Sequence, residues 1–182
     1  MYFDTFPKIL YDSKGQGNPK IVTNLLKRVA IRTKVKNNAS LYDTYTVKNG
    51  ETPESIADKL YDDPELHWIV LMVNDITDRY HQWPMLEQQF NTFVEEKYSN
   101  PDGVHHYEIS QSSGDDTTKI EVYSNSALYS GDTDFYSTSS TVTNREHEER
   151  EQDKKRQIRL LDPRFVDTFV EEFKRLMKES VL

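Results

Sequence analysis

The chain has 182 residues, of which 35% are hydrophobic, 12% aromatic and 30% charged, and its formal net charge at pH 7 is −8. This acidity argues against a general nucleic-acid-binding protein, which needs basic side chains to displace the counterions of the phosphates. The lack of cysteine excludes disulfides and thiolate metal sites.

Two further properties of the composition bear on how the protein acts. Many aromatic residues beside few aliphatic ones suit a protein that completes its burial against partners, since interfaces favour Tyr, Trp and Phe. The first residues lack the basic lead and apolar run of a signal peptide, so no secretion signal is expected. No apolar run approaches the roughly 20 residues of a membrane-spanning helix, so no membrane association is expected.

The first segment, residues 1–40, is predicted to be an arm with too few neighbours for a core of its own. It carries four aromatic residues: Tyr2, Phe3, Phe6 and Tyr11. These side chains either fold back on the next segment or anchor on another chain. A short helix is expected over 21–26. It leads to a strand over 27–36, in which basic and β-branched residues alternate as on a solvated strand face.

The second segment, residues 41–99, predicts a short strand followed by helices. A β-prone run at 45–47 leads through a tight turn to Thr52, which has the position of a helix cap before a proline. A second helix is expected over 64–73 and a third over 85–98, because apolar residues recur there at helical spacing.

The third segment, residues 100–144, is polar and rich in turn residues. Apolar and polar residues alternate at 107–109 and again at 120–122, on either side of a turn, which predicts a β-hairpin. The Ser/Thr-rich run at 137–143 is interpreted as a linker.

The last segment, residues 145–182, begins with a charge-dense helix over 145–156 and a strand over 157–161. Pro163 then begins the helix with the most regular amphipathic spacing in the chain. This helix either packs on the core of its own chain or docks on a partner. Its aromatic positions are Phe165, Phe169 and Phe173.

Motifs that would indicate an enzyme are missing from the sequence. There is no phosphate-binding loop, no Gly-x-Ser-x-Gly elbow and no helical His-Glu-x-x-His pair. The adjacent His105 and His106 are expected to point to opposite faces of a strand and to lie at the surface, where they would not readily share a metal. Neither catalysis, a cofactor nor a metal site is therefore expected.

The run from Tyr45 to Thr52, followed by Ile56–Ala57 and later by Asn74, resembles a LysM module. This resemblance implies a small βααβ unit. LysM modules hold N-acetylglucosamine-containing glycans on two loops, and the corresponding positions here are Gly50, Glu51, Thr52 and Asn74. The residues after Asn74 depart from the usual Gly-Gln-x-Leu run, so these four positions are interpreted as vestigial and glycan binding is not expected.

A wider set of features resembles the LysM-like baseplate wedge proteins of contractile-tailed phages. The features are the arm at 2–7, the helix start at 50–53, the His67–Trp68 helix, the Trp83–Pro84 turn and the 156–161 run before the last helix. This resemblance implies a structural subunit of the virion tail baseplate, assembled in the host cytoplasm and present in several copies. Its partners would be other wedge proteins and neighbouring wedges. The alternative is a peptidoglycan-binding LysM module.

Together these observations predict an α+β fold in four parts: the arm, short helix and strand (1–40), a LysM-like βαα(β) domain (41–99), a hairpin with a polar linker (100–144), and a charged segment with a strand and an amphipathic helix (145–182). Candidate partner contacts are aromatic residues of the parts around the LysM-like core. They are Tyr2, Phe3, Phe6, Tyr11, Trp83, Phe165, Phe169 and Phe173.

Overall fold

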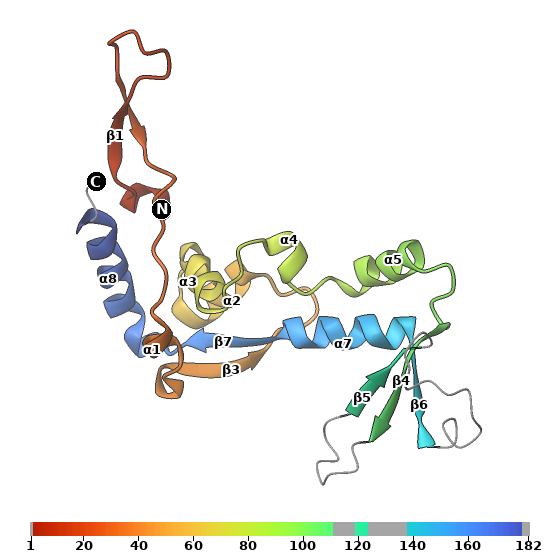
Figure 1. The fold of residues 1–182 in the computed structure, drawn as a ribbon. Helices are drawn as coiled ribbons and strands as arrows, with labels where there is room; N and C mark the ends of the chain where they lie inside the picture. Colours follow the sequence, from red (N-terminus) through yellow and green to blue (C-terminus); the bar gives the residue numbers. More distant parts are fainter. Residues whose placement is uncertain (1, 111–118, 124–137, 180–182) are drawn as a thin grey trace. The chain divides into compact units, whose positions relative to one another are not determined.

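The computed structural model describes the backbone of residues 2–110, 119–123 and 138–179 (Figure 1). Side chains are described for the same residues, apart from those at positions 2, 33 and 34. The mixture of helices with small antiparallel sheets confirms the predicted α+β class. Within these ranges, no helix is both long enough and apolar enough to cross a membrane.

The chain divides into two compact units, each described by itself. The first unit combines residues 1–83 with 156–182, and the second consists of residues 84–155. The second unit is therefore one continuous stretch, whereas the first is built from both ends of the chain.

The N-terminal arm forms an antiparallel two-stranded hairpin. Strand β1 (Lys8–Tyr11) follows a 3₁₀ turn, η1 (Tyr2–Thr5), and pairs with β2 (Lys20–Thr23). Every residue of both strands is exposed. An isolated two-stranded hairpin is marginally stable in water, so we expect this hairpin to be stabilised by packing against another surface.

Two predictions for this arm are wrong. The expected helix over 21–26 is absent, because its first three residues are β-branched and extend as part of β2. The expected strand over 27–36 is absent as well, and its end forms a one-turn helix, α1 (Thr33–Lys36). Alternation alone does not make a strand; the backbone also needs a hydrogen-bonded neighbour, and here the N–H groups of Val35 and Lys36 bond back to Arg32.

A two-stranded sheet and two helices form the core of the first unit. Strand β3 (Tyr42–Thr46) pairs antiparallel with β7 (Gln157–Leu161), although the two lie far apart in the sequence. Helices α2 (Pro53–Tyr61) and α3 (His67–Val73) contribute to the same core. Its buried residues include Val47, Ile56, Ala57, Val70, Ile158 and Leu160. The short elements of the unit are η2 (Ala39–Leu41), η3 (Pro64–Leu66) and α4 (Arg79–Gln82).

The helix start predicted at Thr52 is confirmed. Its hydroxyl accepts a hydrogen bond from the Ser55 N–H at 3.2 Å, and Pro53 occupies the first helical position of α2. Asp63 caps η3 in the same way, accepting from the Glu65 N–H at 2.8 Å. The single helix expected over 64–73 is divided into η3 and the α3 that follows it directly. Helix α3 ends at Val73, as predicted.

The C-terminal helix packs on its own unit. It consists of η4 (Pro163–Phe165) and α8 (Val166–Glu179). The ring centroid of Phe173 lies 4.5 Å from that of Trp68, and Phe6 of the arm is buried in the same cluster. The apolar face of α8 is therefore a core face, the first of the two interpretations left open by its pattern.

The second unit contains two helices and a three-stranded antiparallel sheet. The helices are α5 (Glu87–Lys97) and α7 (Asn144–Arg156), which confirm the two predictions there; Arg156 itself belongs to the first unit. The strands are β4 (Val104–Ser110), β5 (Lys119–Val122) and β6 (Ser140–Thr143), in the order β5-β4-β6.

The register of this sheet confirms one prediction and corrects another. Tyr107 of β4 faces Val122 of β5, as expected for a hairpin, although its turn at 112–116 lies outside the described residues. The run at 137–143 was expected to be a linker, but residues 140–143 form β6 on the other edge of β4. Its Thr and Val residues are β-branched and suit a strand. Residue 137 lies outside the described residues.

Candidate functional site

The arm presents a cluster of exposed apolar side chains, which we call the apolar arm surface. It comprises Phe3, Ile9, Leu10, Tyr11, Ile21, Val22, Leu25 and Leu26. Leu10 and Ile21 are each 70% exposed and Leu26 is 91% exposed. Single exposed apolar residues are ordinary, but eight of them within one short arm indicate an interaction surface.

The strand register distributes these side chains over both faces of the hairpin. Leu10 lies opposite Ile21, and Ile9 lies opposite Val22. Directly opposed residues share a face and successive residues alternate, so each face carries one apolar pair. In a hairpin with one face in solvent, that face usually carries polar residues and only the other face is apolar. The apolar arm surface therefore suits burial on both sides.

Local hydrogen bonds fix the shape of the arm. The Asp12 carboxylate accepts from the N–H groups of Lys14 at 3.1 Å and Gly17 at 2.7 Å across the hairpin loop. The Lys14 hydrogen bond is the main cause that lowers the pKa of Asp12. At the base of the arm, the Asn24 N–H donates to the Pro7 carbonyl at 2.8 Å. Such preorganisation reduces the entropy lost when a loop binds.

The aromatic contact candidates differ in exposure. Three are exposed: Phe3, Tyr11 and Phe165. The others are buried or half-buried: Phe6, Trp83, Phe173 and Phe169. The side chain of Tyr2 lies outside the described residues. The exposed residues Phe3 and Tyr11 belong to the apolar arm surface, whose aliphatic members are not among the candidates predicted from the sequence.

Trp83 was predicted to stand in a loop open to partners, but it lies in the core of the first unit. It is 8% exposed, and its Nε1 donates a hydrogen bond of 2.9 Å to the Glu51 carbonyl. A buried indole N–H needs such an acceptor. In the isolated chain, Trp83 therefore offers little surface to another protein.

The vestigial glycan-loop positions serve the fold. Gly50 has a φ of 86°, which the turn before α2 requires. The Glu51 carboxylate accepts from the Tyr45 hydroxyl at 2.8 Å and from the Lys48 N–H at 2.9 Å. Burial tends to raise the pKa of Glu51, but these hydrogen bonds outweigh it and lower that pKa. Glu51 and the capping residue Thr52 thus have internal roles.

Asn74 also has an internal role. Its Nδ2 donates to the carbonyls of Val70 and Arg159, and its Oδ1 accepts from the Arg159 N–H, each at 2.8 Å. The side chain thereby joins the end of α3 to strand β7.

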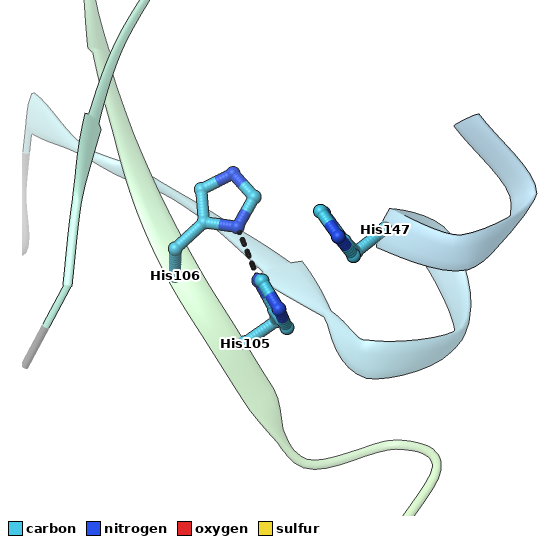
Figure 2. Close-up of side chains that lie close together, drawn as sticks. All are labelled: His105, His106 and His147. Carbon is cyan, nitrogen blue, oxygen red and sulfur yellow. Dashed lines mark hydrogen bonds between the residues drawn. The ribbon is translucent and has the colours of Figure 1, made fainter. Parts of the chain in front are cut away.

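Three histidines converge in the second unit, as Figure 2 shows. The Nδ1 atoms of His105 and His106 lie 2.8 Å apart, and the His147 ring stacks on the His105 ring with centroids 3.8 Å apart. Burial is the main cause that lowers the pKa of His105, and the charges of the two neighbouring imidazoles add to it.

The prediction that His105 and His106 lie apart at the surface is wrong. His106 is 2% exposed, and His105 is half-buried. The pairing of β4 with β6 shifts register between Val104 and His106, and such an irregularity re-aims side chains that would otherwise alternate. His147 comes from α7, and no sequence spacing links it to β4.

Glu148 lies next to this cluster and joins the two helices of the second unit. It is 5% exposed and accepts hydrogen bonds of 2.7 Å from both Lys97 Nζ and the Tyr98 hydroxyl. Burial tends to raise the pKa of Glu148, but these hydrogen bonds outweigh it and lower that pKa.

Comparison with known proteins gives two findings. Residues 1–113 match the family described as Base plate wedge protein 53. Over 60 residues, the chain is 35% identical to the baseplate wedge protein gp53 of Enterobacteria phage T4. That stretch covers 33% of this chain and 31% of the length of the phage T4 protein.

Proposed function

The chain belongs to the Base plate wedge protein 53 family, and we propose that it is a structural component of a phage tail baseplate wedge. It joins wedge subunits through protein–protein contacts and carries no catalytic role. The matched region, residues 1–113, includes the whole apolar arm surface. In this proposal the protein is assembled in the host cytoplasm and resides in the virion tail baseplate, in several copies.

The apolar arm surface is the observation that carries the proposal. A structural subunit needs a surface whose burial on a partner is energetically favourable. The apolar arm surface is both apolar and preorganised. Complete burial of a leucine or isoleucine side chain contributes roughly 1.5–3 kcal/mol. Leu10, Ile21 and Leu26 together can therefore supply a substantial share of the binding free energy.

The two-sided apolar character of the hairpin indicates how it binds. Because Leu10–Ile21 and Ile9–Val22 lie on opposite faces, a partner that covers one face leaves the other exposed. We propose that the arm inserts between two surfaces, contributed by other wedge proteins or by a neighbouring wedge.

Co-expression with the other wedge proteins of the same phage tests this function. The full chain is expected to co-purify with at least one of them at moderate salt. A double variant, Leu10→Thr with Ile21→Thr, places a β-branched residue at both positions but removes the larger apolar side chains, and it should weaken capture at least tenfold. Leu26→Ser, outside both strands, should act in the same direction.

A matched control is Tyr80→Ser, which changes a residue that is 88% exposed in α4 and outside the arm. It should leave capture unchanged. Loss of capture in the control as well as in the arm variants, or no capture of the unaltered chain, would contradict the proposal. Retention of the chain on insoluble peptidoglycan would instead support the LysM alternative.

A further inference from the structure

We propose that His105, His106 and His147 bind a divalent transition-metal ion of the Zn²⁺ type in the second unit. The proposal is independent of the wedge function. Imidazole nitrogen is a preferred ligand for such ions, and three of them are a common set of protein ligands for zinc.

The distances between the histidines suit a shared ion. One ring nitrogen from each of the three lies within 4.8 Å of the others. Tetrahedral zinc with Zn–N bonds of about 2.0–2.1 Å places its ligand nitrogens about 3.3 Å apart. The two Nδ1 atoms of His105 and His106, at 2.8 Å, are already this close.

Binding requires the histidine rings to rotate. The rings of His105 and His147 are nearly parallel, with an interplanar angle of 9°, so their in-plane lone pairs do not yet converge. The His106 ring is turned by 90° from that of His147 (Figure 2). Rotation of a histidine ring about its Cβ–Cγ bond is soft, so the rings can reorient toward a shared ion.

The surroundings of His106 give a second, separate indication. Its Nε2 is buried and has no hydrogen-bond partner among the described residues, yet it lies 3.8 Å from the Glu108 carboxylate. A histidine that binds a metal through one nitrogen usually donates its other N–H to a carboxylate. Ligation through Nδ1 would leave the Nε2 proton facing Glu108, which an ion pair with Arg150 holds in place.

The ligands come from two different elements of the second unit, so a bound ion would have a structural effect. His105 and His106 belong to β4, and His147 belongs to the first turns of α7, so a bound ion would cross-link the sheet to the helix. Three protein ligands leave one tetrahedral position, which a water molecule fills. The ion would therefore stabilise the second unit.

Metal titration of the full chain, without a polyhistidine tag and after treatment with EDTA, tests the site. We expect one equivalent of Zn²⁺ to bind by isothermal titration calorimetry and to raise the thermal unfolding midpoint. His147→Gln should weaken binding by roughly 100-fold or more, and Glu108→Gln by roughly 10–100-fold, as for other residues that orient a ligand. The control His81→Gln, an exposed histidine outside the cluster, should bind as the unaltered chain does.

A second measurement does not depend on how the variants fold. Substoichiometric Co²⁺ added to the unaltered chain should broaden the imidazole NMR signals of His105, His106 and His147, and leave those of His67 and His81 sharp. Absence of binding at equimolar Zn²⁺, or broadening of the signals of His67 and His81 instead, would overturn the proposal.

Discussion

Asn74 holds the backbone of Arg159 from both sides: it donates to the Arg159 carbonyl and accepts from the Arg159 N–H, each at 2.8 Å. An asparagine amide is one of the few side chains that can satisfy both groups of one residue. The link joins α3 to β7 at the position that the LysM resemblance assigns to a glycan loop.

Asn74→Ala should therefore destabilise the first unit. The substitution leaves a partly buried N–H and carbonyl of β7 without their partner, and we expect the free energy of unfolding to fall by about 1–3 kcal/mol. Urea unfolding followed by circular dichroism measures it. Thr46→Ala, on the neighbouring strand with an exposed side chain, should change it by no more than about 0.5 kcal/mol. Equal effects of both substitutions would contradict this role.

Trp83→Phe tests whether the tryptophan is a core residue. Phenylalanine keeps most of the packing but cannot donate to the Glu51 carbonyl, so we expect a loss of about 1–3 kcal/mol in the free energy of unfolding. Capture by wedge partners should not change. Tyr80→Phe, at an exposed site, provides the control and should alter neither quantity. Weaker capture at unchanged stability would show that Trp83 is a contact residue after all.

The ion pair of Lys97 and Glu148 makes stability depend on pH. Because the pKa of Glu148 is lower in the folded protein than its ordinary value of 4.5, its contribution is present above about pH 4.5 and is lost as the pH falls through the folded-state value. Glu148→Gln should lower the free energy of unfolding at pH 7 by about 1.5 kcal/mol. The substitution should also reduce the loss of stability that the unaltered chain shows at acidic pH.

Chemical denaturation at a series of pH values between about 3 and 7 measures the difference in the free energy of unfolding between the unaltered chain and Glu148→Gln. The pKa of Glu172 is lowered too, chiefly by its hydrogen bond with Arg175, but both side chains are half exposed. Glu172→Gln should therefore leave the free energy of unfolding almost unchanged, because exposed ion pairs contribute little. If the free energies of unfolding of the unaltered chain and of Glu148→Gln differ by the same amount at every pH, Glu148 is not a source of the pH dependence.

Asp12 should control the order of the hairpin loop. Asp12→Ala removes the acceptor for the N–H groups of Lys14 and Gly17, so both amides should exchange faster with solvent. Capture by wedge partners should weaken, because a looser loop loses more entropy on binding. Hydrogen exchange followed by NMR measures the first effect. Lys14→Ala, which keeps both backbone hydrogen bonds, should leave the exchange rates unchanged.

The sequence predicted those elements whose cause is local. The α2 start follows from Thr52 and Pro53, which act within one helical turn, and the helix after Pro163 follows from apolar residues at helical spacing. The strand at 157–161 was predicted as an element, but its pairing with β3 was not. Pairing between short strands far apart in the sequence leaves no periodic signal.

The features that escaped prediction depend on neighbours in space. Residues 21–26 are expected to form a short helix, but the chain turns back through Gly15 and Gly17, both at positive φ, and places Ile21 opposite Leu10. The meeting of His105 with His147 depends on an irregularity between β4 and β6 and on where α7 starts. Neither can be read from residue order alone.

The pairing of β3 with β7 has a consequence for the order of folding. Residues 84–155 form a continuous unit, so all of it is synthesised before β7. Strand β3 is synthesised earlier but must wait for residues 157–161, so the sheet of the first unit closes only after the second unit has been made. A nascent chain halted before β7 would therefore contain every residue of the second unit, while Tyr42–Thr46 still lacked its partner strand and remained an open strand edge that chaperones could recognise.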